Sequence, residues 1–190
     1  MDLSGQGPGN VIVGLFKPSC TSETEKQWQV YYDQDYNFTV EYPVDGWQTD
    51  TSWHILDAKP NSIAKRTTFF GEQARIIIDI WDHPQEDMVN WVHDYLYKTD
   101  MDQKITINAQ IAGFPGVAFI EENEQAPTAI GVAFNDNNHF FLIQYLIGDS
   151  GDGMDTYLHL LKSFTLKTEN NDGLGTAGDF VFPFCLSFEY

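Results

Sequence analysis

Three carboxylates and one imidazole lie close together around position 80 of the chain, at Asp79, Asp82, His83 and Asp87. Carboxylate oxygens and imidazole nitrogens are ligands for divalent metal ions. Helix capping is an alternative, because Asp82 precedes Pro84 at the start of an expected helix and Asp87 falls in its first turn. We favour capping and retain Asp79, Asp82 and His83 as candidate metal ligands.

A second acidic stretch, DSGDGMD, runs from Asp149 to Asp155. Glycines among carboxylates are typical of calcium-binding loops, but this stretch lacks the D-x-D-x-D-G order and the terminal glutamate of an EF-hand. The start of a helix explains the same acidic residues. Asp149 and Asp152 are therefore candidate ligands for a weakly bound calcium ion, and we expect no other cofactor.

The sequence contains no recognisable catalytic motif. It has neither the H-E-x-x-H pattern of zinc peptidases nor the G-x-S-x-G turn of serine hydrolases, and no glycine pattern that binds phosphate or a dinucleotide. Its 5 histidines include no pair at zinc-ligand spacing. We therefore expect no catalytic residues and no enzyme activity.

Two cysteines, Cys20 and Cys185, stand near opposite ends of the chain. A disulfide between them would close a loop that spans most of the chain, which the loop-entropy model values at about 4–5 kcal/mol. Two separate buried thiols that act as small apolar side chains are the alternative. Both interpretations stay open, and neither cysteine has the C-x-x-C spacing of a metal or redox site.

The chain is strongly acidic, with 28 Asp and Glu residues against 10 Lys and Arg residues and a net charge of −18. Such a surface repels nucleic-acid phosphates and anionic lipid headgroups, so we expect no nucleic-acid partner. No run of about 18 apolar residues occurs, and we expect no direct insertion into a membrane. The expected partner is a protein, for example one with a basic surface, or a neutral polymer of the cell envelope.

Composition divides the chain into three parts. Residues 1–27 form a polar arm whose apolar run, Val11 to Phe16, could add a strand, and residues 28–167 are expected to form one domain. Residues 168–190 begin as a linker and end in an apolar segment that either docks back on the domain or starts a further one. The first ten residues lack the features of a signal peptide, so we expect the signal or anchor of an extracytoplasmic protein to lie outside this chain.

Five apolar runs separated by turn residues predict strands. They cover residues 74–81, 104–112, 116–121, 129–134 and 139–147. The last three are joined by short polar turns and predict an antiparallel meander. The stretch from Phe140 to Ile147 is apolar on both faces, which predicts a strand at the centre of a sheet.

Two amphipathic segments predict helices, at residues 84–98 and 152–164. Each has apolar residues at helical spacing on one face, and we interpret these residues as core and not as a cofactor site. They are Met88, Trp91, Val92, Tyr95 and Leu96 in the first segment, and Met154, Tyr157, Leu158 and Leu161 in the second. The two helices are expected to cover the sheet.

Residues 31–47 predict a hairpin, because aromatic-rich runs flank the polar turn Asp33-Gln34-Asp35 and the second run ends at Pro43. This stretch resembles the opening of PsbP-like proteins of the PsbP/Mog1/DcrB-like superfamily. The residues that carry the resemblance are Tyr32, Asp35, Tyr36, Phe38, Tyr42, Pro43 and Trp47. The order of expected strands and helices extends the similarity over about residues 28–166.

The resemblance implies an α+β fold, in the form of an α-β-α sandwich with a central, mainly antiparallel β-sheet. It also implies a non-catalytic binding or assembly module of a generic bacterial type, located outside the cytoplasm as a secreted or cell-surface protein. One alternative is a calcium-linked extrinsic assembly factor of photosystem II, which is the role of PsbP itself. Another is an accessory domain of a larger cell-surface hydrolase.

Overall fold

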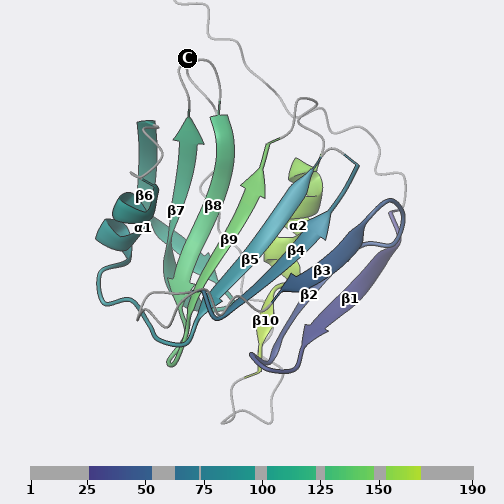
Figure 1. Cartoon of the computed structure of the whole chain (residues 1–190), viewed down its shortest axis with the longest axis horizontal. Coiled ribbons are helices and arrows are strands. Elements are labelled where there is room, and N and C mark those ends of the chain that lie inside the picture. Colours follow the sequence, from purple (N-terminus) through teal and green to yellow (C-terminus); the bar gives the residue numbers. More distant parts are fainter. Residues whose placement is uncertain are drawn as a thin grey trace, which may run out of the picture.

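The structure is a computed structural model that describes residues 26–52, 63–72, 74–96, 102–122, 127–147 and 153–167 (Figure 1). These residues form an α+β fold whose strands pair antiparallel. The elements in chain order are β1 (Trp28–Asp33), β2 (Phe38–Pro43), β3 (Gln48–Ser52), β4 (Lys65–Phe70), β5 (Arg75–Trp81), α1 (Met88–Leu96), β6 (Asp102–Ile111), β7 (Phe114–Glu122), β8 (Pro127–Asn135), β9 (Phe140–Leu146), α2 (Met154–Ser163) and β10 (Thr165–Leu166).

Seven strands form the larger sheet, in the order β3-β4-β5-β9-β8-β7-β6. Consecutive strands β7, β8 and β9 are antiparallel neighbours, which confirms the predicted meander. Strand β9 occupies the middle of the sheet, and its residues Phe140 to Tyr145 are all buried. The prediction from its two apolar faces is therefore confirmed.

The opening hairpin belongs to a second, three-stranded sheet in the order β1-β2-β10. The hairpin itself is confirmed, with Trp28 opposite Pro43 and Asp33 opposite Phe38. A single central sheet was expected, and the structure differs because Phe38 and Val40 are completely buried in the core. These side chains hold the hairpin against a face of the larger sheet and not at its edge.

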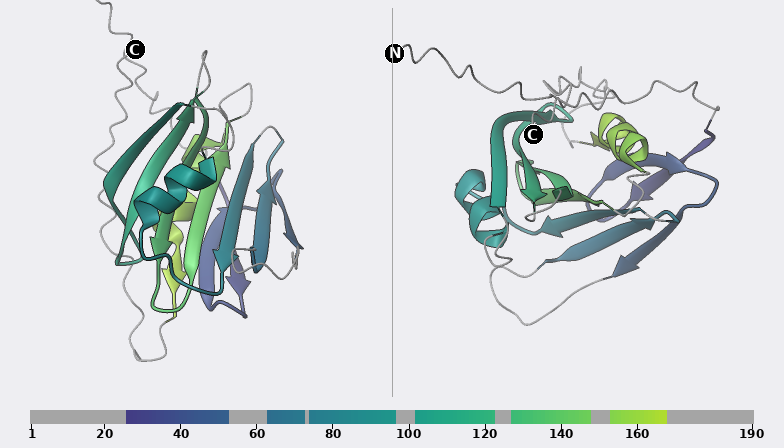
Figure 2. Two further views of the ribbon diagram at one scale, coloured as in Figure 1. Left: turned by 60° about the vertical axis from the view of Figure 1, so that its left-hand side comes forward. Right: turned by 90° about the horizontal axis from the view of Figure 1, so that it is seen from above.

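The larger sheet has a hydrophobic cluster on each face. The main cluster joins the sheet residues Ile76, Ile78 and Ile143 to the small sheet and to Leu160 and Leu161 of α2. The smaller cluster lies under α1, and its members are Trp81, Val92, Val117, Phe119, Ala133, Phe140 and Leu142. Figure 2 shows α1 and α2 on opposite sides of the curved sheet, with the small sheet on the same side as α2.

Helix α1 begins at Met88, four residues after the predicted start at Pro84. The side chain of Asn135 holds the backbone of Gln85 in a non-helical connection, with Gln85 N–H donating to Asn135 Oδ1 and Asn135 Nδ2 donating to Gln85 O. Asp87 is the residue that caps the helix, because its Oδ1 accepts the Asn90 N–H at 3.0 Å. The expectation that Asp82 caps this helix is therefore wrong.

Helix α2 matches its prediction closely and buries Thr156, Tyr157, Leu160 and Leu161. No helix in the described part of the chain is long and apolar enough to cross a membrane. The arm before residue 26, the segment after residue 167, Cys20 and Cys185 lie outside the described residues. The domain bounds and the disulfide therefore stay predictions.

Candidate functional site

The turn of the opening hairpin is built around a buried ammonium group. Lys65 Nζ on β4 lies 2.7 Å from Asp33 Oδ2 and 2.8 Å from Asp35 Oδ2. Asp33 also accepts the backbone N–H groups of Asp35 and Tyr36 through Oδ1, which closes the turn. Burial lowers the pKa of Lys65, but its hydrogen bonds to the two aspartates outweigh this effect and raise the pKa above its ordinary value. Lys65 is therefore a fixed cation and not a general base.

Tyr36 extends this centre to the loop after β5. Its hydroxyl donates to Asp82 Oδ1 at 2.7 Å, and its ring meets His139 edge-on at a centroid distance of 5.0 Å. Burial and the negative charge of Asp82 raise the pKa of Tyr36 well above its ordinary range. The phenol therefore stays neutral and acts as a hydrogen-bond donor that ties the hairpin to the larger sheet.

A second ion pair joins the neighbouring strands β4 and β5. Arg66 lies directly opposite Asp79, and its guanidinium donates through Nε and Nη2 to the two carboxylate oxygens at 2.6 and 2.7 Å. The Asp79 side chain is completely buried. Such a bidentate pair satisfies both carboxylate oxygens of Asp79 and fixes the register of the two strands.

The candidate metal ligands thus have separate surroundings. Asp79 pairs with Arg66, and Asp82 accepts the Tyr36 hydroxyl. Asp149 and Asp152 lie outside the described residues. Within the residues that the structure describes, no group of three or more His, Cys, Asp and Glu side chains could hold a metal ion. The weak calcium site, and the part that His83 was given in it, stay predictions.

Lys65 and Arg66 were not among the predicted site residues, although the sequence carries a signal for them. They are the only two adjacent basic residues in a chain with 10 basic residues in all. They also open the stretch KRTTFF, whose β-branched and aromatic residues favour a strand. Two cations on opposite faces of such a strand require anionic partners on both sides, and Asp33 and Asp79 provide them.

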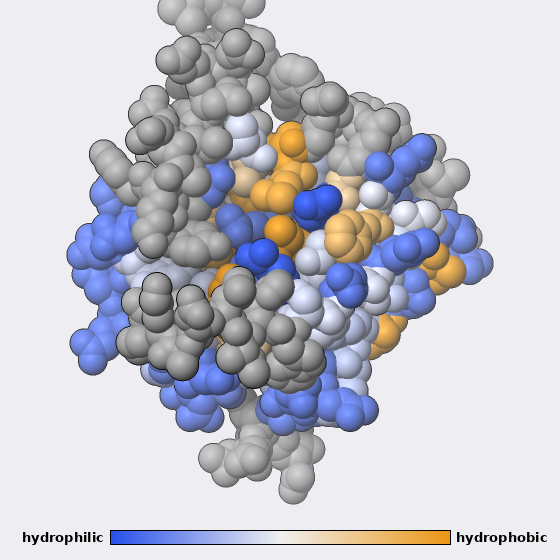
Figure 3. All heavy atoms as spheres, viewed as in Figure 1, coloured by the Kyte–Doolittle hydropathy of each residue, from blue (hydrophilic) through white to orange (hydrophobic). Residues whose placement is uncertain are grey.

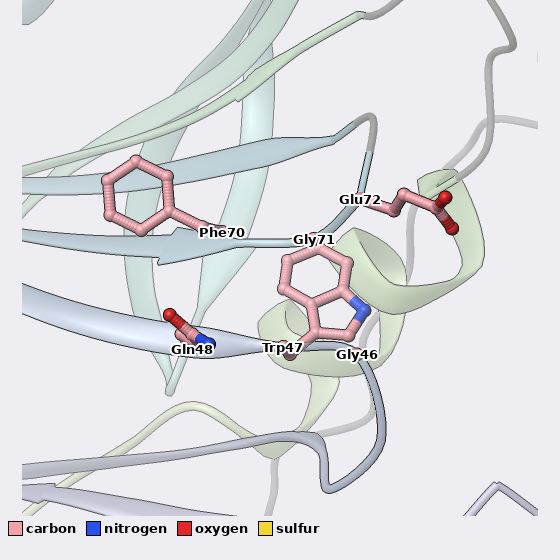
Figure 4. A pocket seen from close by; sticks show the side chains of 6 residues that line it. All are labelled: Gly46, Trp47, Gln48, Phe70, Gly71 and Glu72. Atoms are coloured by element: carbon pink, nitrogen blue, oxygen red, sulfur yellow. The ribbon is translucent and has the colours of Figure 1, made fainter.

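An aromatic depression lies where β3 begins and β4 ends. It has a volume of about 290 Å³, and Figure 4 shows its lining residues Gly46, Trp47, Gln48, Phe70, Gly71 and Glu72. The Trp47 indole packs over Gly71 so closely that a Cβ atom there would lie 2.8 Å from its Cζ2. Gly71 therefore sets the position of the indole and the shape of the depression.

Phe70 connects this depression to the face of the larger sheet that carries α1. It stands opposite Gln48 on β3 and opposite Arg75 on β5, whose guanidinium lies 5.2 Å from the Phe70 ring centre. Leu146 of β9 follows Arg75 in the same cross-strand row. Figure 3 shows hydrophobic residues near the middle of this face, with hydrophilic residues between them. The depression thus opens onto a mixed aromatic and polar surface.

Of the comparisons with known proteins, only that with solved structures gives a match. No protein-family model matches the chain, and no curated protein matches its sequence. Among solved structures, the solution structure of cyanobacterial PsbP (CyanoP) from Synechocystis sp. PCC 6803 is similar, with a TM-score of 0.51 and 12% sequence identity. The match covers 78% of this chain and 98% of that chain. At this identity the similarity concerns the fold alone, and it confirms the resemblance inferred from the opening hairpin: this chain has a PsbP-like fold.

Proposed function

We propose that the chain is a non-catalytic binding module of the PsbP-like type, which acts outside the cytoplasm at the cell surface or after secretion. Its partner is a protein that presents a basic segment. We propose further that its layers correspond to the α-β-α sandwich of PsbP-like proteins, with the small sheet added beside α2.

The surroundings of the ionisable residues support a non-catalytic role. Lys65 is held as a cation by Asp33 and Asp35, and Tyr36 is held neutral by burial and by Asp82. A general base or nucleophile needs a proton affinity near the working pH, and these two groups are shifted away from it. The centre at the hairpin turn therefore has a structural role, because it joins the turn to β4 and to the loop after β5.

The observation that carries the binding proposal is the depression formed by Trp47 and Phe70. Aromatic faces and a carboxylate are the groups that receive a cationic side chain, through cation–π contacts and charge. Glu72 supplies a carboxylate at the depression, and Asp50 follows Gln48 by two residues on β3. The net charge of −18 also attracts a basic partner at long range.

Gln48 is exposed and lines the depression, so a charge can be placed there without disturbing the core. We would immobilise the wild type, Gln48→Lys and Val89→Lys, and incubate each with envelope extract from the organism that makes the chain. Val89→Lys adds the same charge on α1, away from the depression. Bound proteins would be eluted with salt and identified by mass spectrometry.

The proposal expects a basic protein that the wild type and Val89→Lys retain and Gln48→Lys loses. The added lysine would repel the partner's cationic segment and fill part of the depression. The proposal fails if nothing is retained, if only a carbohydrate polymer is retained, or if all three forms retain the same proteins equally.

A further inference from the structure

Exposed apolar side chains gather at one margin of the small sheet. The described residues include four exposed large hydrophobic side chains, and three of them lie on or next to the β1–β2 hairpin. Val30 is 63% exposed, and Tyr32 and Val44 are each 42% exposed. Val30 and Tyr32 share a face of β1 with Trp28, since side chains two residues apart point the same way.

The backbone of the same residues points away from β2. Trp28 stands opposite Pro43, which has no N–H to give, and Val30 stands opposite Glu41, whose N–H donates instead to Ser163 Oγ at 2.8 Å. In an antiparallel pair, residues that do not exchange hydrogen bonds direct their N–H and C=O groups to the outer edges. The polar backbone groups of Trp28, Val30 and Tyr32 therefore line the free margin of β1.

This margin lacks the usual protection of an edge strand. Among the described strands β1 has a neighbour on one side only (Figure 1). Its first five residues, WQVYY, include no charged residue and no proline, whereas exposed edges normally carry one or the other. In a chain with a net charge of −18, these five residues add no negative charge, and Lys167 Nζ lies 4.8 Å from the Tyr32 ring centre, so a second acidic copy meets less repulsion at this edge than at an acidic surface.

We propose that β1 pairs antiparallel with β1 of a second copy of this chain, which joins two small sheets into one continuous six-stranded sheet. A two-fold axis through the pair would place Val30 opposite Val30 of the partner subunit. Trp28 would then lie opposite the partner subunit's Tyr32, and the contact repeats by symmetry. In this register the outward-pointing backbone N–H and C=O groups of one β1 strand bond those of the other. The exposed apolar side chains of the two strands pack against each other.

The charges at the two ends of β1 fit the same arrangement. Lys26 lies two residues before the strand and is exposed, and Asp35 lies two residues after it with half of its side chain exposed. In the antiparallel register centred on Val30, Lys26 comes level with the turn that holds the partner's Asp35. A parallel arrangement would instead place the two lysines together, which disfavours it.

The test compares Val30→Lys with Val89→Lys, which adds the same charge on α1, by analytical ultracentrifugation of the full chain. We would scan from about 10 µM to about 1 mM, the range expected for a small interface. Wild type and Val89→Lys should reach a dimer as concentration rises, and Val30→Lys should stay monomeric. Amide exchange at Val30 and Tyr32 should slow as the dimer forms.

Three results would overturn the proposal: a wild type that is monomeric throughout, a dimer that survives Val30→Lys, or slow exchange at Val30 in the monomer. The last result would mean that another segment of the same chain covers β1. Since no β1 residue lines the Trp47–Phe70 depression, loss of the dimer and loss of the basic partner are separate outcomes.

Discussion

Lys65 Nζ and Asp33 Oδ2 lie 2.7 Å apart, and both side chains are buried. A buried pair of this kind contributes little net stability compared with apolar residues, but removal of one partner leaves an uncompensated charge. The opening hairpin therefore depends on a residue more than twenty positions away from it in the chain.

We expect Lys65→Met to lower the free energy of unfolding by about 3–5 kcal/mol, because Asp33 would stay buried without its cation. Urea titration would measure the change. Lys162→Met, at an exposed position on α2, should change it by less than about 0.5 kcal/mol. The double variant Asp33→Asn, Lys65→Met should recover part of the loss. Equal losses in Lys65→Met and in the control Lys162→Met would contradict the prediction.

Stability should fall as the pH rises above about 10, where tyrosine and lysine side chains of an unfolded chain lose their protons. Burial raises the pKa of Tyr157, and burial together with Asp82 raises that of Tyr36, so the folded state keeps protons that the unfolded state releases. Lys65 contributes to the pH dependence in the same direction, since its pKa is also raised in the folded state. The stability that these groups contribute is therefore complete below pH 10 and is lost above it.

Urea midpoints measured between about pH 8 and about pH 11 would test this dependence. Tyr157→Phe should flatten the alkaline slope, because the unfolded state then has no proton to release at that position. Tyr32→Phe, at a position with 42% exposure, is the matched control, since it removes a tyrosine hydroxyl outside the core. An alkaline slope that is the same in both variants would show that the raised pKa of Tyr157 does not cause the loss of stability.

The ring of Phe119 lies over Gly131 on the neighbouring strand, where a Cβ atom would overlap its Cζ. Phe119 is buried and cannot move without disturbing the cluster under α1. We expect Gly131→Ala to cost about 1–3 kcal/mol by overpacking, as measured by thermal or urea unfolding. Combination with Phe119→Leu should cost less than the sum of the two single changes, and simple additivity would show that the two residues do not compete for space.

Gly71→Ala should displace the Trp47 indole from the depression, since the new Cβ would lie 2.8 Å from its Cζ2. We expect the fluorescence of Trp47 to shift to longer wavelength as the ring becomes more exposed to water. The same substitution in a Trp47→Phe background should produce no shift, which isolates this residue from the other four tryptophans. An unchanged spectrum would mean that the loop around Gly71 moves instead.

Apolar patterning predicted the middle of the fold, because β9 is buried on both faces and its neighbours are joined by short polar turns. It did not predict β4, because the first two residues of this strand are cations. They can lie in the sheet because Lys65 pairs with Asp33 and Arg66 pairs with Asp79. The start of α1 was misplaced for a related reason, since a distant side chain, Asn135, holds the residues before it. These partners are distant in sequence, so local spacing carries no sign of them.

The depression could not be predicted from the sequence either. Trp47 packs against the main cluster while remaining half-buried. Its indole lies on Gly71 because the start of β3 is paired with the end of β4, which no periodicity in either strand indicates. Nothing in the sequence around Gly71 indicates that the Trp47 indole packs on it.

Strands β1 and β10 lie on opposite sides of β2, with Trp28 beside Pro43 at one end and Leu166 beside Phe38 at the other. Tension applied between residues 26 and 167 would run along the strands and at right angles to the hydrogen bonds that join them. Those bonds would be loaded in shear, all together, and not unzipped one at a time. The small sheet would thus serve as a mechanical clamp for a chain that is pulled from both sides.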